Sequence, residues 1–320
     1  MQDSGSVLVL TNPYDVTADL VLRLLADRRV PVVRLDPGTD LHAGASLTAT
    51  YHADGQQGTL RTASREIDTT RVHSVWVRRP SPYLGPPGLS DQDRRFAAEQ
   101  TLWGAGGIIA SLPAAHYMNH PWHNRAAESK PAQLSTAQRC GFPVPSTVIT
   151  NDPDEARTFA AHQPGGVVYK PLWNTTYRVD GQPHSVWVRE VGANDITDAV
   201  AVCPHVFQAR VSKEFDARVT AVGGQLLAVR IDSPDIDWRR RQDLMTCTSI
   251  DVPEPIAHAA VAYLAEFGLV YGAFDFAVTA EGVWYFLECN PNGQWAWQPA
   301  DTTKAVAHAI TEQLAKGPGT

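Results

Sequence analysis

FDFAV occupies residues 274–278, the pair Glu281-Gly282 follows, and WYFLECN occupies residues 284–290. Apolar and polar side chains alternate in both segments, which is typical of two antiparallel strands with one buried face. A two-residue turn at Glu281-Gly282 would place Asp275 directly opposite Glu288, with Asn290 on the same face. The other face then carries the apolar side chains, which we expect to form core: Phe274, Phe276, Val278, Tyr285 and Leu287.

This hairpin would bring two carboxylates together, and like charges directly opposite each other destabilise a sheet unless a cation lies between them. Carboxylate and amide oxygens suit Mg²⁺, which can also hold phosphate oxygens. The alternative is an exposed polar face, because a register shift of one residue would separate the two acids. The pattern predicts a magnesium site made by Asp275, Glu288 and Asn290.

Lysine is scarce in this chain, since only five of the 27 basic residues are lysines. A lysine retained among so many arginines suggests a need for its compact ammonium group. Lys130 precedes a predicted helix start, where anions are favoured, and Lys170 ends an apolar strand. Either side chain could be ordinary solvated surface. If the protein binds a magnesium nucleotide, both are suited to neutralising its phosphates.

Other kinds of site find little support. No loop has the spacing of a Walker motif, and the GAGG at residues 104–107 lies late in a helical stretch. His116, His120 and His123 resemble a metal cluster, but Pro121 interrupts any helix that would align them, so we expect structural roles. Nucleophilic hydrolase chemistry is not indicated, because the sequence has no serine elbow and no recognisable cysteine–histidine setting.

Composition bounds the class of protein. The chain has 320 residues, of which 43% are hydrophobic, so two or three modules are expected. The net charge is −7, whereas a dedicated nucleic-acid binder usually has an excess of basic residues. The cysteines lie far apart, and no apolar run approaches the length of a membrane span. These features predict a soluble cytoplasmic protein with reduced thiols.

The first part of the chain follows an alternating pattern. Strands are predicted at residues 6–11, 32–36 and 74–77, and helices at residues 17–29 and 91–103. Strands that alternate with helices favour a small parallel α/β domain.

A second module begins near residue 119, with a helix at residues 131–140 that has proline in its first turn. Asp180-Gly181 indicates a hairpin between residues 177–179 and 185–191. From residue 205 the strands follow an antiparallel pattern. We therefore expect an α/β fold with three domains, at residues 1–118, 119–204 and 205–320.

Residues 205–242 are locally basic inside an acidic chain, with seven basic residues among five acidic ones. The basic residues are Arg210, Lys213, Arg218, Arg230, Arg239, Arg240 and Arg241. This segment suits an anionic ligand, although a solvated loop is the alternative for its last three arginines.

The order of these motifs resembles that of the ATP-grasp superfamily over nearly the whole chain. Asn119-His-Pro, Lys130 and GFPVPST at residues 141–147 resemble the entry to the central ATP-grasp domain. VYKP at residues 168–171 resembles the motif of the second ATP lysine, and Phe207-Gln208 resembles the adenine hinge. DARV at residues 216–219 resembles the strand after that hinge. Asp275, Glu288 and Asn290 match the magnesium ligands of the superfamily.

The resemblance implies an ATP-grasp fold with a parallel N-terminal domain, a central domain and an antiparallel C-terminal domain, with ATP clamped between the last two. It implies the following roles: ATP binding by Lys130, Lys170, Gln208 and Lys213, and stabilisation of transferred phosphoryl or acyl-phosphate oxygens by Arg218 and Arg230. The sequence departs from the pattern at two places. Ala209 replaces the usual acidic residue after the hinge glutamine, and the glycine-rich phosphate loop is missing between Lys170 and Gly181.

Within the superfamily, three segments resemble the graspetide (microviridin-type) peptide maturases: VWVRRP at residues 75–80, DWR at residues 237–239 and ECNPNGQW at residues 288–295. The likeness implies a ligase that uses ATP and Mg²⁺ to activate Asp or Glu side chains of a ribosomally made precursor peptide. The activated carboxylates would be joined to Thr or Ser hydroxyls as esters, or to Lys amines as amides, and esters are expected. The partner would be a precursor with a leader and a core rich in Thr, Asp and Glu, and a homo-oligomer stays open.

Two alternatives remain beside this expectation. One is an ATP-grasp ligase that adds a free amino acid to a protein or peptide, which the RRP segment and the CNPNGQW run disfavour. The other is a non-catalytic nucleotide-binding scaffold, which the intact set of magnesium ligands disfavours.

Overall fold

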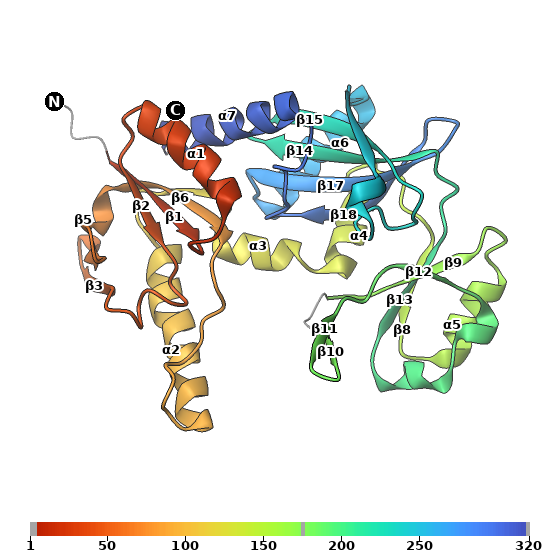
Figure 1. Cartoon of the computed structure of the whole chain (residues 1–320), viewed down its shortest axis with the longest axis horizontal. Coiled ribbons are helices and arrows are strands. Elements are labelled where there is room, and N and C mark those ends of the chain that lie inside the picture. The colour runs from red at the N-terminus through yellow and green to blue at the C-terminus, as the bar shows by residue number, and fades with distance from the viewer. Residues whose placement is uncertain (1–4, 174–176, 318–320) are drawn as a thin grey trace.

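The structure is a computed structural model that describes residues 5–173 and 177–317. The described residues form two four-stranded sheets, one five-stranded sheet, a three-stranded sheet and a two-stranded hairpin. Figure 1 shows the larger sheets arranged around a middle segment that contains α3 (Pro121–Ala127). The mixed α/β architecture agrees with the predicted fold class. No helix in the described part of the chain is both long and apolar enough to cross a membrane.

The N-terminal sheet is parallel, as predicted, with the strand order β2-β1-β6-β7. Its strands are β1 (Ser6–Thr11), β2 (Val32–Leu35), β6 (Val72–Arg79) and β7 (His116–Met118). Two helices flank it, α1 (Val16–Asp27) and α2 (Asp91–Ala110). The side chain of Ser90 caps α2 by accepting a hydrogen bond from the Asp93 amide, which satisfies an otherwise unpaired donor at the helix start.

A small antiparallel sheet between β2 and β6 was not predicted. It consists of β3 (Ser46–His52), β4 (Gly55–Arg61) and β5 (Glu66–Asp68). Most side chains of β3 are exposed, so these strands lack the strong apolar alternation that identifies a strand in sequence.

The central sheet has the antiparallel order β12-β9-β13-β8. Its elements are β8 (Thr147–Thr150), α5 (Pro153–Ala161), β9 (Val167–Lys170), β12 (Arg189–Val191) and β13 (His205–Ala209). Because β13 pairs with β8 and β9, this sheet extends past residue 205, where the third domain was expected to begin. The short 3₁₀ segments in the described chain are Thr69–Arg71, Ala193–Asp195, Asp198–Val202 and Gln242–Leu244.

The hairpin predicted at Asp180-Gly181 is present. It joins β10 (Tyr177–Val179) to β11 (Gln182–His184), so its second strand comes earlier than predicted. Asp180 and Gly181 have φ angles of 49° and 77°, and positive values at both positions define the two-residue turn that matches the twist of a hairpin.

The large sheet has the antiparallel order β16-β15-β14-β17-β18. Its strands are β14 (Phe215–Val222), β15 (Gln225–Asp232), β16 (Thr246–Ile250), β17 (Tyr271–Val278) and β18 (Trp284–Asn290). One face packs an aromatic core against α4 (Lys130–Arg139) and α6 (Glu254–Phe267), and this core contains Phe142, Tyr263, Phe274, Phe276 and Phe286. The large apolar area buried here fixes the position of β17 and β18.

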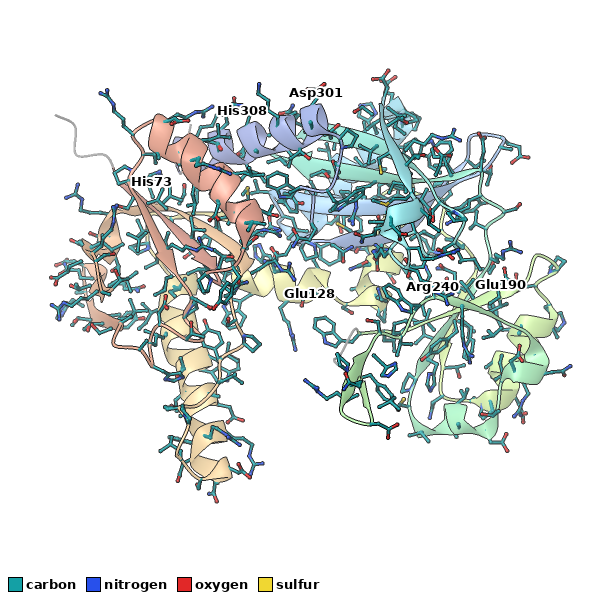
Figure 2. All side chains as sticks on the ribbon, viewed as in Figure 1. His73, Glu128, Glu190, Arg240, Asp301 and His308 are labelled. Atoms are coloured by element: carbon teal, nitrogen blue, oxygen red, sulfur yellow. The ribbon has the colours of Figure 1, made fainter. Side chains whose placement is uncertain are left out.

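One end of the other face of the large sheet is covered by packed side chains, and the other end borders a cavity. Helix α7 (Ala300–Lys316) covers one end of it together with α1 and β6, where Val222, Tyr271 and Ala273 join a core with Val9 and Trp76. His73 of β6, which is labelled in Figure 2, also hydrogen-bonds the Leu314 carbonyl of α7 at 3.1 Å. The opposite end of this face faces the central sheet.

The β17–β18 hairpin places Asp275 opposite Glu288, as predicted, but by a different route. The turn has three residues, 280–282, closed by hydrogen bonds between Thr279 and Val283 and between Gly282 and Thr279. Near the turn the strand register therefore differs by one residue from the predicted register. A bulge in the ladder between Asp275 and Phe276 restores the predicted pairing of Asp275 with Glu288. Because of the longer turn, Trp284 and Phe286 face the core, and beyond the bulge Cys289 does so as well. The prediction of Tyr285 and Leu287 as core was therefore wrong.

Candidate active site

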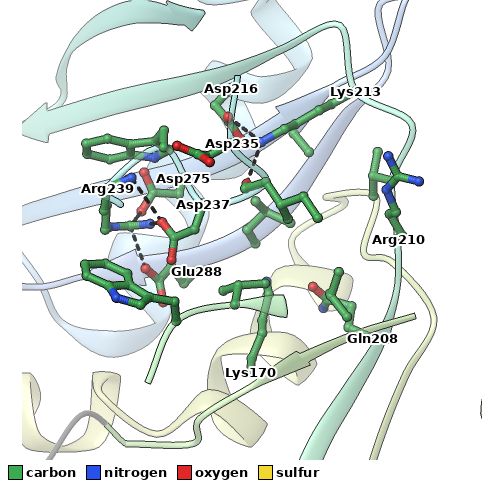
Figure 3. A pocket seen from close by; sticks show the side chains of 18 of the residues that line it. Lys170, Gln208, Arg210, Lys213, Asp216, Asp235, Asp237, Arg239, Asp275 and Glu288 are labelled. Carbon is green, nitrogen blue, oxygen red and sulfur yellow. Dashed lines mark hydrogen bonds and ion pairs between the residues drawn. The ribbon is translucent and has the colours of Figure 1, made fainter. Parts of the chain in front are cut away.

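A cavity of about 540 Å³ lies where the central sheet meets the large sheet. Its walls come from β9, β13, β14, β17, β18 and the loop at residues 233–239 (Figure 3). A volume of this size is typical of small-molecule sites. Period-two alternation on β14 and β17 turns Asp216, Asp275 and Ala277 toward it.

Two carboxylates form the floor of this cavity. Asp275 is 3% exposed, and Glu288 faces it from β18. Burial raises the pKa of Asp275 despite the neighbouring Arg218 and Arg239. Burial acts in the same direction on Glu288, but Lys130 and Arg239 hold the pKa of Glu288 well below its usual range. The amide of Asn290 donates to Glu288 Oε1 at 3.3 Å.

A guanidinium group lies between the two acids. Arg239 Nη2 donates to Asp275 Oδ2 and, at 2.8 Å, to Glu288 Oε1. Arg239 Nη1 reaches Asp237 Oδ1 at 3.4 Å. The carboxylates raise the pKa of Arg239 against the effect of burial, so its positive charge is permanent.

Two lysines from different elements line the cavity that contains the acids. Lys130, the first residue of α4, donates to Glu288 Oε2 at 2.7 Å. Lys170 ends β9 and lines the same cavity. Both are at element ends, as predicted, and the fold brings them to the carboxylate pair.

The donor set fits Mg²⁺ and a phosphate-bearing ligand. Asp275 and Glu288 offer oxygens across one pair of strands, and Asp275 Oδ1 has no hydrogen-bond partner although Arg218 Nε lies 3.2 Å away. The nearby lysines could neutralise phosphate oxygens. No group of three or more His, Cys, Asp or Glu side chains suited to a metal exists within residues 5–173 and 177–317, so a metal here would also need Asn290, water or ligand oxygens.

Two of the three histidines at residues 116, 120 and 123 hydrogen-bond backbone carbonyls. His120 Nε2 hydrogen-bonds the Ala110 carbonyl at 2.8 Å, and His123 Nδ1 the Gly268 carbonyl at 3.0 Å. The rings of His120 and His123 pack with their centroids 4.9 Å apart. Structural roles were predicted, and these contacts agree with them.

The family described as the MvdD pre-ATP grasp domain matches residues 6–125 of the chain. Among solved structures, a Chryseobacterium gregarium RiPP-associated ATP-grasp ligase in complex with ADP, and a leader and core peptide, has a TM-score of 0.88 at 25% identity. That comparison covers 98% of this chain and 97% of the other. The chain has the ATP-grasp fold.

Two macrocyclases from Microcystis aeruginosa MRC have similar structures. MdnC, bound with the precursor peptide MdnA, has a TM-score of 0.85 at 25% identity, covering 98% of this chain and all, 100%, of that one. MdnB has a TM-score of 0.81 at 29% identity, covering 97% of this chain and 99% of that one. No curated protein matches the chain in sequence. The structural likenesses confirm the resemblance to the graspetide maturases.

The remaining predicted ATP-binding residues, Gln208 and Lys213, line the same cavity. Gln208 is buried on β13 and donates to Thr147 Oγ1 at 2.9 Å. Lys213 donates to Asp216 Oδ2 at 2.5 Å and to the Ile236 carbonyl at 2.7 Å. The segment predicted to cover the phosphates includes residues 174–176, which lie outside the described residues.

The two predicted phosphoryl-stabilising arginines have different positions. Arg218 lies under Asp275, with its guanidinium 5.6 Å from the ring centre of Trp238 and 5.9 Å from that of Trp297. Arg230 does not line the cavity. It pairs with Ala217 on β14, so it points to the opposite sheet face, where it contacts Asp232 and Glu214 and stacks on Phe215. The predicted role of Arg230 is therefore corrected.

Sequence analysis missed Arg239 and Asp216 as site residues. Asp216 lines the cavity, and burial raises its pKa to about 6 although Lys213 opposes this. The signal for Arg239 was present in the DWR segment at residues 237–239. Its position depends on the burial of Trp238 against Val229 and Ile231, which no local pattern reveals.

A buried arginine connects the N-terminal sheet to the residues that follow Asn290. Arg78 Nη1 donates to the Asn292 carbonyl at 2.9 Å, and Nη2 donates to Gln294 Oε1. Arg78 Nε lies 3.4 Å from Asp15 Oδ2, with both side chains 3% exposed. Asn119 adds hydrogen bonds from its amide to the Pro291 and Tyr271 carbonyls, each 2.9 Å. We call residues 291–295 the Pro291–Trp295 loop.

We expect nucleotide binding to depend on the protonation of Lys170. Burial lowers the pKa of Lys170 to about 8, although Glu288 opposes this. Phosphates favour the protonated ammonium, so affinity should fall as pH rises above 8, and binding at pH 8 should take up about half a proton. Calorimetry of a non-hydrolysable ATP analogue at pH 8, in two buffers of different ionisation enthalpy, measures this uptake. In Lys170→Arg the charge is permanent and the uptake should vanish; equal uptake in both proteins would contradict the role of Lys170.

Proposed function

We propose that this chain is an ATP- and Mg²⁺-dependent macrocyclase that joins side chains within a ribosomally made precursor peptide. The observation that carries the proposal is the carboxylate pair on the floor of a cavity that also holds Lys130 and Lys170. The chain is similar over nearly its full length to a ligase in complex with ADP and a leader and core peptide, and to a macrocyclase bound with its precursor.

The residues divide into those that hold the nucleotide and those that position them. Asp275, Glu288 and Asn290 would hold Mg²⁺, which neutralises charge on the phosphates when it is bound. Lys130 and Lys170 would neutralise phosphate oxygens, and Gln208 and Lys213 would lie along the rest of the nucleotide. Arg218 would position Asp275 from beneath.

The proposed reaction needs no side-chain nucleophile. An oxygen of a substrate carboxylate attacks the γ-phosphorus, the bond to the ADP oxygen breaks, and an acyl phosphate forms. A hydroxyl oxygen then attacks the acyl carbon, the bond from that carbon to the phosphate oxygen breaks, and the hydroxyl proton ends on the departing phosphate. Negative charge spreads over the phosphoryl oxygens during the first step, so positioning and electrostatic stabilisation supply the rate enhancement.

We propose Asp or Glu side chains as the carboxylates and Thr or Ser hydroxyls as their partners, giving esters. The cavity walls include Arg210, Lys213 and Arg239, which favour an acidic peptide core. An amide to Lys would follow the same steps with an amine as nucleophile.

The test combines the enzyme, ATP, Mg²⁺ and the short Thr-, Asp- and Glu-rich peptide encoded beside its gene. Mass spectrometry should show the loss of one water for each link. Mild base should open esters, which regain the water, whereas amides would persist. A mass gain that matches an added amino acid would establish the alternative ligase, and ATP binding with no product would favour a scaffold.

A further inference from the structure

Arg239 occupies the position where the metal ligands converge. A single nitrogen, Nη2, donates to one oxygen of Asp275 and one oxygen of Glu288 (Figure 3). These are the two oxygen sources that the proposed function assigns to Mg²⁺. The structure therefore has a permanent cation in contact with both acids.

The two carboxylates need a cation in this geometry. They face each other across neighbouring strands, and Asp275 is almost fully buried. An unpaired buried charge is strongly destabilising, and like charges opposite each other on strands repel. Lys130 contacts only Glu288, and Arg218 approaches only the Asp275 oxygen that Arg239 does not use. Arg239 is the group that bridges the pair.

A guanidinium nitrogen and a metal ion compete for these side chains. Mg²⁺ holds its ligand oxygens at about 2.0–2.1 Å, closer than a hydrogen-bonding nitrogen, and both cations satisfy the same two negative charges. Binding of one should therefore disfavour the other.

We propose that Arg239 is an internal cation that neutralises Asp275 and Glu288 in the metal-free protein and is displaced when the metal binds. The proposal rests on the proposed function, because it takes these acids as metal ligands. It adds that the Arg239 side chain competes with the metal for the two acids. The affinity for the metal then depends partly on the free energy needed to move Arg239 away from them.

The loop around Arg239 allows the side chain to leave while its backbone stays. Trp238 is buried, Lys213 holds the Ile236 carbonyl, and Arg241 pairs with Asp235 through two hydrogen bonds of 2.7 and 2.9 Å. The Arg239 side chain itself is 31% exposed. Its stacking on Trp238, with 4.6 Å between guanidinium and ring centre, and its ion pair with Asp237 offer places that do not need the metal ligands.

The test is the affinity for Mn²⁺, used as a probe of the metal site and measured from the signal of the free ion in electron paramagnetic resonance. Competition lowers apparent affinity by the fraction of protein in which the site is open. Arg239→Gln should therefore bind Mn²⁺ more tightly than the wild type, on the order of tenfold. Asp275→Asn, which loses a ligand, should bind it more weakly.

Arg210→Gln is the matched control. It removes the same charge from a residue of the same cavity, but Arg210 pairs with Glu190 and touches neither metal ligand. If Arg210→Gln tightens Mn²⁺ binding as much as Arg239→Gln does, the effect is general electrostatics and displacement is wrong. Equal or weaker binding in Arg239→Gln would also overturn the proposal.

A second variant covers failure of Arg239→Gln to fold, which a thermal melt would reveal. Arg239→Lys keeps the charge but has a shorter side chain and lacks the second nitrogen that reaches Asp237, so its bridge should be weaker and its Mn²⁺ affinity about threefold higher than that of the wild type. Unchanged affinity in this variant would overturn the proposal. Absence of Mn²⁺ binding in every protein would instead overturn the metal site and the proposed function with it.

Discussion

Asp275→Asn and Glu288→Gln are each expected to lower ATP-dependent turnover roughly a hundred- to a thousand-fold. Each change replaces a charged oxygen ligand by a neutral amide of almost the same shape, so the geometry of the β17–β18 hairpin should survive. The measurement is phosphate release at several Mg²⁺ concentrations, with circular dichroism to verify folding.

Glu281→Gln is the control, because Glu281 is an exposed acid in the turn of the same hairpin. Its turnover should equal that of the wild type. Full activity with unchanged Mg²⁺ dependence in either ligand variant would exclude the assignment of Asp275 and Glu288 as metal ligands.

Arg78→Met is expected to destabilise the protein by about 3–5 kcal/mol, since it leaves the buried Asp15 carboxylate without its ion pair. It also removes the hydrogen bonds that hold the Pro291–Trp295 loop. The melting temperature should fall by roughly 10 °C, and the neighbouring Arg79→Met, at an exposed position, should change it little.

A double variant separates the lost ion pair from lost packing. Adding Asp15→Asn to Arg78→Met removes the unpaired charge and should restore part of the stability. If the double variant is less stable than Arg78→Met by the full effect of Asp15→Asn alone, the two side chains do not interact and the interpretation of this ion pair is wrong.

The hairpin that carries the acids could be predicted because its alternation is local. Its apolar side chains and turn residues lie within 17 positions, residues 274–290. The choice between a two-residue and a three-residue turn was not available from the same pattern, and this choice moved Tyr285 and Leu287 out of the core. Asp275 and Glu288 still face each other because a bulge compensates for the longer turn.

Arg230 and Arg239 illustrate the opposite case. The resemblance placed Arg230 in the site, but the side of the sheet to which it points depends on its pairing with Ala217. Arg239 lies in an irregular loop, and its direction follows from Trp238 packing under β15. Both facts are tertiary, so neither can be predicted from composition or periodicity.

Val9, Trp76, Tyr271 and Trp295 pack with α7 in one core. The N-terminal sheet and the C-terminal helix therefore depend on each other for their packing. Exchanging residues 1–118 for the equivalent segment of a relative would therefore change the side chains against which the Pro291–Trp295 loop packs. A recombinant enzyme of that kind should work only if residues 291–295 and α7 come from the same donor. Residues 1–118, residues 291–295 and α7 should therefore be exchanged together, although they are separated in the sequence.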